Sequence, residues 1–380
     1  MLLRCTGFCF CLKHTSSSQR PHPTVIHELC HQFSLHDLRN ATNNFHQKRL
    51  VRYNKLAKVY KGCLQHNDVS EYTVAIKRFN AENNEGHDQF KNETELLCQL
   101  HHPNIISLKG FCDQKDEKII VYEYMSNGSL DERLQSGELS WKKRLEICIG
   151  VARGLHYLHA GAKRTIIHRD VCLRSILLDD NMEPKLTGFG FSILGARFMS
   201  KPKVIPVDDH VRGTCGYMPT EYFRDSNVTD KCDVFSFGMI LLQIVWGTDY
   251  FQMSEREEFM EKPIEENIDP NIRGRIAPEC WLVFIDIILR CVKYEADERP
   301  TMGEVEVELE HALTLQEQAD ITNIDCKYTL LSKFIINLKR NRILAHDLSW
   351  MGKKLFDMPA VREEFMEKPI QDDIDLNIKS

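Results

Sequence analysis

Three short stretches decide the fold: His168-Arg169-Asp170, then Ile176-Leu177-Leu178-Asp179, then Lys185-Leu186-Thr187-Gly188-Phe189-Gly190. The first two together have the pattern of a catalytic loop, in which Asp170 is the candidate base. The third is typical of a strand that runs into a loop. Gly188 offers no side-chain oxygen there, so the stretch predicts a catalytic frame that lacks one chemical group.

On the N-terminal side of these stretches the sequence has the patterns of strands. Residues 72–77 are β-branched and alternating, and residues 105–108 and 118–124 give further strand signals. We therefore expect a β-rich first lobe over about residues 46–125. Helical spacing of apolar residues occurs at 33–45 and at 87–100.

On the C-terminal side the pattern becomes helical. Ser140 is a candidate N-cap, and an apolar stripe follows it. A helical second lobe is expected over about residues 126–315. A strand-rich part followed by a helix-rich part predicts an α+β protein with two lobes and with ligands bound between them. The stripe consists of Leu145, Ile149, Ala152, Leu155 and Leu158.

Composition excludes several classes of protein. The chain has 380 residues, of which 42% are hydrophobic and 27% charged, as in soluble globular proteins. The formal charge of −6 argues against a nucleic-acid partner. No pair among the 14 cysteines has zinc-ligand spacing, so reduced thiols are expected. No apolar run reaches the ~20 residues of a membrane span, and residues 237–246 are predicted to form a core helix.

Residues 1–32 are predicted to be a cysteine-containing tail and a polar linker. The cysteines lie beside apolar residues and Arg4, a setting that suits S-palmitoylation and a tether to the cytoplasmic face of the plasma membrane. The alternative is a tail with incidental cysteines in a cytoplasmic protein. N-myristoylation is not expected, because Leu2 follows the initiator methionine. The candidate cysteines are Cys5, Cys9 and Cys11.

The C-terminal part contains an internal repeat. After the domain expected over residues 33–315, the extension 316–380 carries a partial duplicate of residues 256–272, in which Arg256–Ile264 recurs letter for letter as Arg362–Ile370. A single duplicated fragment is not a solenoid. We favour a partial duplication without packing partners, and a functional docking tail is the alternative.

Five motifs follow one another in the order typical of protein kinases. With Phe33-Ser34 and Ala41-Thr42-Asn43-Asn44-Phe45 ahead of them, the chain resembles the plant receptor-like kinase family over roughly residues 33–315 and is similar to FERONIA-type kinase domains. The resemblance implies a bilobal protein-kinase fold, in a receptor-like cytoplasmic kinase without an ectodomain. The motifs are Val74-Ala75-Ile76-Lys77, His168-Arg169-Asp170, Gly213-Thr214-Cys215-Gly216-Tyr217-Met218, Asp233-Val234-Phe235-Ser236-Phe237-Gly238 and Asp297-Glu298-Arg299-Pro300-Thr301.

The same resemblance implies a set of catalytic and ATP-binding residues. Lys77 matches the lysine that contacts the α- and β-phosphates, Glu93 matches its ion-pair partner, and Asp170 matches the base that orients the substrate hydroxyl. The residues that match the ATP-binding set are Val51, Val59, Ala75, Lys77, Tyr124, Met125 and Leu177. Those that match the packed framework are Leu97, Leu108, His168 and Phe189, the gatekeeper Tyr122, and the buried ion pair Glu221–Arg299.

Departures from the family pattern lie around the phosphates. The three glycine positions of the phosphate loop hold Arg52, Asn54 and Ala57, although glycine is used there so that backbone can approach phosphate. Gly188 replaces the metal-binding aspartate and Ser175 replaces the metal-binding asparagine. No metal site is therefore expected, and ATP is expected to bind weakly and without magnesium. Cys172 also replaces the lysine of the catalytic loop.

Three hypotheses follow for function. The first is a pseudokinase, a catalytically impaired kinase homologue that acts as a signalling scaffold or allosteric partner of an active receptor-like kinase. The second is a weak or atypical ATP-dependent Ser/Thr kinase that uses Lys77, Glu93 and Asp170. The third is a decayed duplicate without a stable role.

Overall fold

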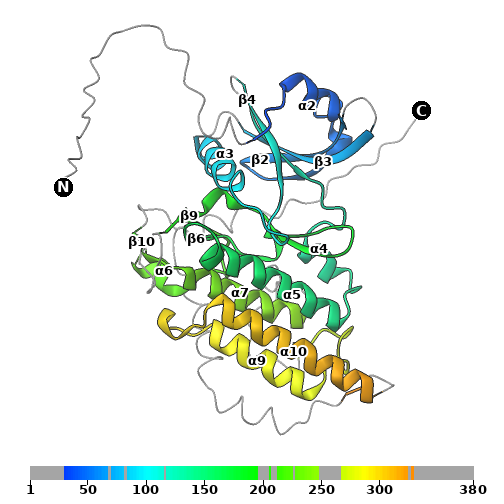
Figure 1. The fold of residues 1–380 in the computed structure, drawn as a ribbon, viewed down its shortest axis with the longest axis vertical. Helices are drawn as coiled ribbons and strands as arrows, with labels where there is room; N and C mark the ends of the chain where they lie inside the picture. The colour runs from blue at the N-terminus through cyan, green and yellow to red at the C-terminus, as the bar shows by residue number, and fades with distance from the viewer. Residues whose placement is uncertain are drawn as a thin grey trace, which may run out of the picture.

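The computed structural model describes residues 30–66, 70–80, 84–114, 117–195, 205–206, 212–225, 227–247, 267–323 and 327–328. It has two lobes stacked along the long axis, a β-rich lobe followed by a helical one (Figure 1). The expected bilobal α+β architecture is confirmed. The candidate tail cysteines and both copies of the repeated nine-residue run lie outside the described residues.

The first lobe is built on a five-stranded antiparallel sheet with the order β1-β2-β3-β5-β4. The longest pair, β2 and β3, is in register along ten residue pairs from Ala57↔Phe79 to His66↔Ser70. The strands are β1 (Leu50–Tyr53), β2 (Ala57–His66), β3 (Ser70–Phe79), β4 (Leu108–Gln114) and β5 (Glu117–Glu123).

Helix α2 (Leu35–Ala41) begins at Ser34, whose hydroxyl accepts a hydrogen bond from the Asp37 amide at 3.1 Å. It ends at Ala41, because residues 43–45 have φ values between 52° and 56°. Left-handed residues cannot continue a right-handed helix. The helix predicted over 33–45 is therefore real but shorter.

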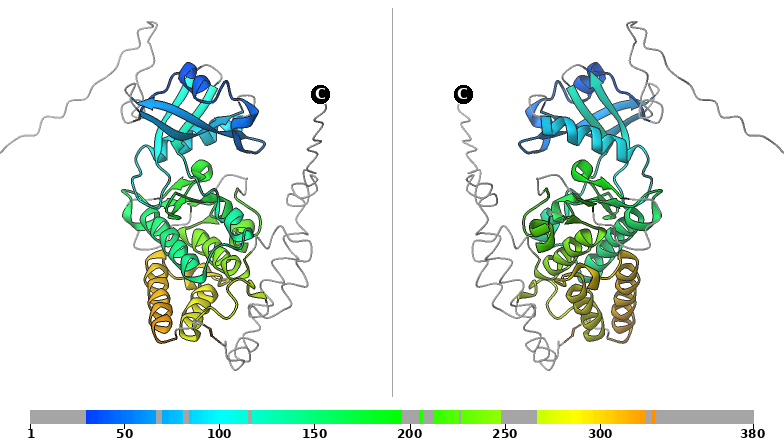
Figure 2. Two further views of the ribbon diagram at one scale, coloured as in Figure 1. Left: turned by 90° about the vertical axis from the view of Figure 1, so that its right-hand side faces the viewer. Right: turned by 90° about the vertical axis from the view of Figure 1, so that its left-hand side faces the viewer.

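Helix α3 (Asn84–Leu97) lies between the sheet and the second lobe (Figure 2). It presents buried Phe90, Leu96 and Leu97 to the core. The end of the expected linker also packs on this lobe, since the carbonyl of His31 accepts from the Phe111 amide at 3.0 Å.

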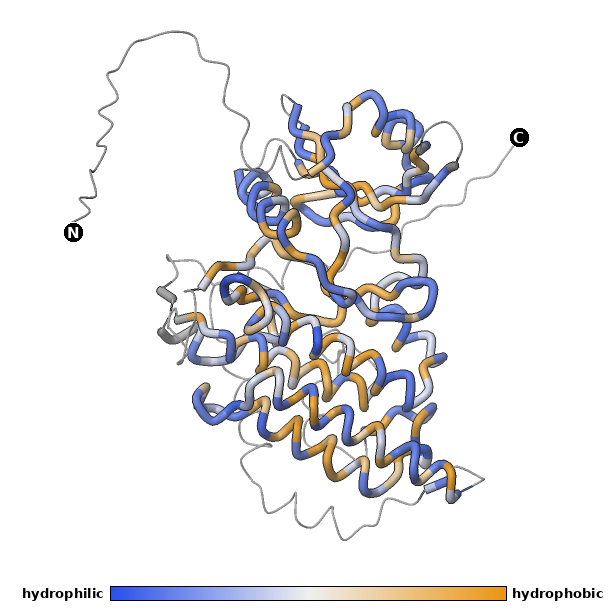
Figure 3. The backbone as a smooth tube through the Cα atoms, viewed as in Figure 1, coloured by the Kyte–Doolittle hydropathy of each residue, from blue (hydrophilic) through white to orange (hydrophobic). Residues whose placement is uncertain are grey.

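The second lobe is helical, and hydrophobic positions recur along its helices (Figure 3). The predicted core helix is confirmed, because every residue of α7 from Lys231 to Trp246 is buried. Ser140 caps α5 as expected, and its hydroxyl accepts from the Lys143 amide. The helices are α4 (Leu130–Gln135), α5 (Trp141–His156), the π-helix η2 (Tyr157–Gly161), α6 (Thr220–Asp225), α7 (Asp230–Trp246), α9 (Pro278–Cys291) and α10 (Met302–Thr322).

Short elements join these helices. The strand pairs are β6 (Ile166–Ile167) with β9 (Ile193–Leu194), β7 (Ile176–Leu178) with β8 (Pro184–Leu186), and β10 (Ile205–Pro206) with β11 (Asn227–Val228). The single 3-10 turns are η1 (Gln47–Arg49), η3 (Leu173–Ser175), η4 (Phe189–Phe191) and η7 (Ala296–Glu298).

Two predicted boundaries differ from the structure. The strand expected at 105–108 is wrong, since Ile105 forms only an isolated bridge to Leu186 and β4 begins at Leu108. The Ile106 amide donates to the Leu186 carbonyl at 2.9 Å, so this segment pairs with the second lobe before it enters the sheet. The domain end expected at residue 315 falls inside α10, which continues to Thr322.

Candidate functional site

The site lies where the two lobes meet. The connection after β5 is tied to β7, because the Asn127 amide donates to the Leu178 carbonyl at 3.1 Å and the Leu178 amide donates to the Gly128 carbonyl at 2.9 Å. Met125 in this connection is buried, and the ring of Tyr124 lies 4.7 Å from the ammonium of Lys61. These contacts hold Tyr124 and Met125, two of the ATP-binding candidates, against the short strand that carries Leu177.

The predicted Lys77–Glu93 pair is formed. Lys77 on β3 donates from Nζ to Oε2 of Glu93 on α3 at 2.7 Å. The side chain of Glu93 is 1% exposed and that of Lys77 is 19% exposed. Burial, and then the Glu93 charge, raises the pKa of the neighbouring Tyr122 well above its usual range. The carboxylate therefore meets one cation and one neutral phenol.

A buried carboxylate on α7 holds the backbone of the catalytic loop. Asp233 accepts from the backbone amides of His168 at 2.8 Å and Arg169 at 2.9 Å, and His159 Nε2 lies 2.8 Å away. Burial alone would raise the pKa of Asp233, but these hydrogen bonds and the nearby imidazole charges outweigh it, so the pKa lies below its usual range. The loop geometry thus depends on an ionised group in the core.

Asp170 is half-buried and has a partner from the activation segment, which the family resemblance places at residues 191–220. The Thr214 hydroxyl donates to Asp170 Oδ1 at 2.6 Å, and it lies 3.7 Å from Cys172 Sγ. Burial, and then the Asp170 charge, raises the pKa of the Cys172 thiol to about 11. Cys172 is therefore neutral at pH 7 and does not supply the positive charge that a lysine would place there.

The two positions that match the metal ligands of the kinase family, Gly188 and Ser175, provide no free ligand. Gly188 has φ of 89°, and a Cβ built on it would meet Ser175 Cβ at 3.7 Å and His168 Cε1 at 4.0 Å, which are ordinary contacts. Ser175 Oγ accepts from the Cys172 amide and donates to the Cys172 carbonyl, both at 3.0 Å. Within the described ranges, no group of three or more His, Cys, Asp or Glu residues could hold a metal ion. Magnesium does not fit these residues.

In the phosphate loop between β1 and β2, a side chain of the loop itself accepts hydrogen bonds from the loop backbone. Asn54 Oδ1 accepts from the Leu56 amide at 2.9 Å and from the Ala57 amide at 2.8 Å. These are the backbone donors that a glycine-rich loop would turn toward phosphate. The asparagine closes the turn internally instead.

The remaining ATP-binding candidates lie on both sides of the site. On the sheet, Val59 is directly opposite Lys77, and Ala75 is two residues before Lys77 on the same face. Val59, Ala75 and Leu177 are half-buried, and Val51 is 56% exposed. The structure therefore brings Val59, Ala75 and Lys77 onto one face, with Leu177 in the other lobe.

The packed framework is assembled. The rings of His168 and Phe189 lie 4.9 Å apart at 63°, and Leu97 and Phe189 are buried. Sequence reasoning missed Asn92, whose Nδ2 donates to the carbonyls of Phe189 at 3.1 Å, Gly190 at 3.0 Å and Ser192 at 2.8 Å. Its position beside Glu93 on α3 was the one available signal.

Side chains of the catalytic loop and of α3 hold the described parts of the activation segment. The Arg169 guanidinium donates from Nε to the Tyr222 hydroxyl at 3.1 Å and from Nη1 to the Phe191 carbonyl at 3.2 Å. Arg212 pairs with Glu85 on α3 at 2.7 Å. Tyr222 could not be predicted, because a hydroxyl that binds a guanidinium distant in the sequence leaves no local sequence pattern.

The expected ion pair at the base of this segment is also present. Arg299 donates to both carboxylate oxygens of Glu221, at 2.5 and 3.0 Å. It also donates to the carbonyls of Lys293 and Tyr294, and its side chain is 1% exposed. The activation segment is thereby fixed to the loop before α10.

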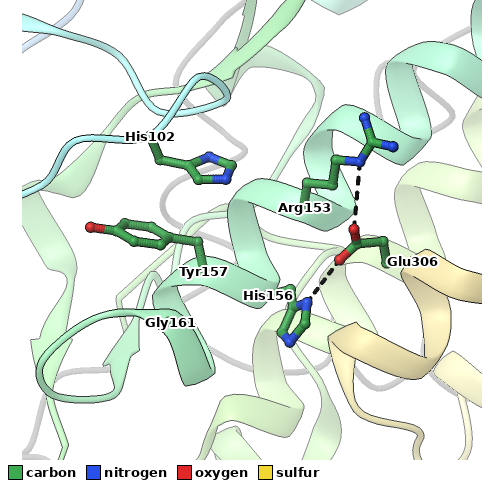
Figure 4. A pocket seen from close by; sticks show the side chains of 6 residues that line it. All are labelled: His102, Arg153, His156, Tyr157, Gly161 and Glu306. Carbon is green, nitrogen blue, oxygen red and sulfur yellow. Dashed lines mark hydrogen bonds and ion pairs between the residues drawn. The ribbon is translucent and has the colours of Figure 1, made fainter.

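A separate cavity of about 260 Å³ lies away from these residues, on the helical lobe (Figure 4). The rings of His102 and Tyr157 stack at 4.8 Å and 16°. The Glu306 carboxylate lies 2.8 Å from His156 Nδ1 and 3.5 Å from Arg153 Nε, so it is paired with two basic side chains of the cavity wall. Residues from the loop before β4, from α5, from η2 and from α10 line the cavity. None of the predicted ATP-binding residues is among them.

Among the described residues, no helix has the length and apolar character needed to cross a membrane.

Comparison with known proteins supplies the family. Residues 45–309 match the family described as protein tyrosine and serine/threonine kinase. Three Arabidopsis thaliana receptor-like protein kinases are similar to the chain. ANXUR2 is 41% identical over 306 residues, which cover 77% of this chain and 35% of that protein. FERONIA is 39% identical over 312 residues (77% and 33%), and THESEUS 1 is 38% identical over 299 residues (75% and 34%).

The chain thus spans about a third of the length of these curated relatives. The match over residues 45–309 confirms the predicted kinase fold, and the three relatives confirm the resemblance to FERONIA-type kinase domains. On both grounds, the chain belongs to the protein tyrosine and serine/threonine kinase family and is a homologue of the receptor-like kinases.

Proposed function

We propose that this chain is a pseudokinase that acts as a signalling scaffold or allosteric partner of an active receptor-like kinase. The observation that carries the proposal is the pair of metal positions: Gly188 has no side chain, and the Ser175 hydroxyl is bonded to the Cys172 backbone. Phosphoryl transfer depends on metal ions to neutralise the phosphates, and loss of that effect costs several kcal/mol in the transition state.

The assembled framework supports a binding role. The Lys77–Glu93 pair, the Arg299–Glu221 pair and the packing of Phe189 join elements that are distant in the sequence into one framework. A rigid, preformed surface loses little entropy when it binds a partner. The same contacts argue against a decayed duplicate, which would have no reason to retain buried ion pairs.

A weak or atypical Ser/Thr kinase is the second candidate. The observation in its favour is that Lys77, Glu93 and Asp170 retain an arrangement suited to transfer, with Thr214 bonded to Asp170. Such an enzyme would need metal held by the nucleotide phosphates and water alone.

We also propose that the chain binds ATP weakly and without a need for magnesium. Val59, Ala75 and Leu177 provide apolar contacts for the adenine, and Lys77 provides one phosphate contact. A thermal shift with ATP in EDTA that equals the shift in magnesium is expected. A shift that appears only with magnesium would mean that a metal ligand exists outside the positions considered.

For location we propose a tether at the cytoplasmic face of the plasma membrane through palmitoylated Cys5, Cys9 and Cys11. Two acyl chains suffice for stable anchoring. Replacement of all three cysteines by serine should move the protein into the cytosol. An unchanged distribution would refute this anchor.

The partner role is tested with an active relative. Autophosphorylation of the FERONIA kinase domain is measured alone, with the wild-type chain, and with the Asp170→Asn chain. We expect wild type and variant to alter the rate equally, because the effect comes from binding. No change with either chain would refute the partner role, and a change with wild type alone would favour the weak-kinase candidate.

A further inference from the structure

We propose that Arg52 is the phosphate-binding cation of this site, and that its guanidinium takes the polyphosphate of an adenine nucleotide where active kinases use metal. The inference rests on the proposed nucleotide binding and adds the residue and ligand group that make binding independent of magnesium.

The first observation is the register of the sheet. Strand β1 has a bulge between Leu50 and Arg52, after which Arg52 is directly opposite Val59, and Val59 is directly opposite Lys77. Residues directly opposite on neighbouring strands project from the same face. Arg52 therefore shares a face with Val59, an adenine-contact candidate, and with Lys77, the phosphate-contact candidate. Without the bulge, a one-residue shift would place it on the other face.

The second observation is the place that the guanidinium reaches. Arg52 Nη1 donates to the carbonyl of Arg174 in the other lobe at 3.1 Å. The next residue along the chain is Ser175, whose carbonyl accepts from the Thr187 amide at 2.9 Å, and Thr187 precedes Gly188. The Arg52 head group thus contacts the backbone one residue before Ser175, in the segment that is bonded to the residue before Gly188.

The third observation concerns charge. Among the described residues, no carboxylate lies within ion-pair distance of Arg52, and its guanidinium makes one hydrogen bond there, to a carbonyl. A guanidinium has five donors, so four remain for other acceptors. Relative to the family pattern, the site has gained a positive charge at Arg52, lost a negative one at Gly188 and lost a positive one at Cys172, which leaves it more positive by one charge.

These observations point to a polyphosphate as the ligand. A planar guanidinium can donate to two phosphate oxygens at once, and such charge-assisted pairs are about twice as strong as neutral ones. Because the site is more positive, it favours a nucleotide whose phosphates carry no bound metal. Protein cations then neutralise the phosphate charge in place of magnesium. Lys77 holds one end of the chain of phosphates and Arg52 the other.

The test is nucleotide binding by calorimetry on the full chain in EDTA, with ATP and adenosine as the two probes. Arg52→Ala should weaken ATP binding by at least about tenfold, since a hydrogen bond to a charged group contributes that much, and should leave adenosine within about twofold. Arg52→Lys, which keeps the charge and loses the fork, should fall between wild type and Arg52→Ala. Lys55→Ala, which removes an exposed cation from the same hairpin, should bind ATP like wild type.

Each other outcome has a distinct meaning. If Arg52→Ala strengthens binding of both probes, Arg52 only closes the site by its contact with Arg174, and the inference is overturned. Equal weakening of ATP and adenosine would likewise refute a phosphate contact. ATP binding that is the same in Arg52→Ala as in wild type would overturn the inference alone. A wild type that binds no ATP, whether or not it binds adenosine, would also remove the proposed ATP binding. Unchanged thermal midpoints of the variants establish that they are folded.

Discussion

The framework of this kinase homologue and its phosphate region have diverged to different degrees. In the framework, Lys77 reaches Glu93, Arg299 reaches Glu221, and Phe189 packs on His168. In the phosphate region, the corresponding groups are absent or already bonded within their own loops, as at Gly188, Ser175 and Asn54. The contrast shows that the residues which stabilise the fold can be retained while neighbouring residues that bind phosphate and metal are replaced.

Burial explains the difference. Glu93, Arg299 and Phe189 are at most 2% exposed, so a change there would leave a cavity or an unpaired charge in the core. Metal ligands and glycine-loop amides face the ligand, so their loss costs function and little stability. A chain that is not selected for catalysis can therefore change its ligand-facing residues while it keeps its buried framework residues.

The largest expected effect is on the framework. Arg299→Ala should lower the free energy of unfolding by about 3–5 kcal/mol, because it leaves the Glu221 carboxylate without the Arg299 charge and removes the hydrogen bonds from Arg299 to three carbonyls. Urea denaturation followed by tryptophan fluorescence measures this. Lys293→Ala removes a half-exposed ion pair with Glu298 in the same loop and should cost no more than about 1 kcal/mol. Similar losses for both variants would contradict the distinction between buried framework and surface.

The next largest expected effect is a gain of magnesium-dependent ATP binding when the two metal positions are restored. Gly188→Asp with Ser175→Asn should make ATP stabilise the protein more in magnesium than in EDTA, by about 2–3 kcal/mol at a hundredfold excess over Kd. The space beside Gly188 accepts a Cβ, although a non-glycine residue with φ of 89° is strained by about 1 kcal/mol.

Thermal shift reports this difference as several degrees. Gly188→Asn with Ser175→Asn is the matched control, since it fills the same space without the charge. If wild type already shows the magnesium-dependent shift, the description of the metal positions is wrong.

The sequence predicted the fold and most of the framework because those features are encoded locally or by ordered motifs. The apolar run at residues 237–246 located the core helix, which begins earlier, at Asp230, and motif order paired Lys77 with Glu93. The strand expected at 105–108 failed because its apolar residues serve an interlobe contact. The partners of Asn92 and Arg52 could not be predicted, since they lie 97 or more residues away in sequence and depend on how the lobes meet.

A smaller effect concerns pH and the cavity in the helical lobe. Burial lowers the pKa of His102 from its usual value and outweighs the Glu306 charge, which raises it, while the Arg153 charge adds a smaller lowering; Nδ1 of His102 accepts from the Asn104 amide at 3.1 Å. The unfolded chain therefore binds a proton more readily, so His102 stabilises the fold above about pH 6.5 and loses that contribution as pH falls.

His102→Asn should reduce the fall in melting temperature between pH 7.5 and pH 5.5 by about a few degrees. Asparagine can still accept from the amide two residues on and does not titrate. His101→Asn, at an exposed neighbour, should leave the wild-type pH dependence in place. An unchanged slope in His102→Asn would show that another group controls acid stability.

The most direct test of the central claim is transfer of labelled phosphate from ATP by the full chain, in magnesium and in manganese, compared with Asp170→Asn. The account predicts that both proteins stay at background, in autophosphorylation and on a generic substrate, while the FERONIA kinase domain is active under the same conditions. Asp170-dependent turnover at more than about ten times background, equivalent to ~1.4 kcal/mol of transition-state stabilisation, would contradict it and identify the chain as an atypical kinase.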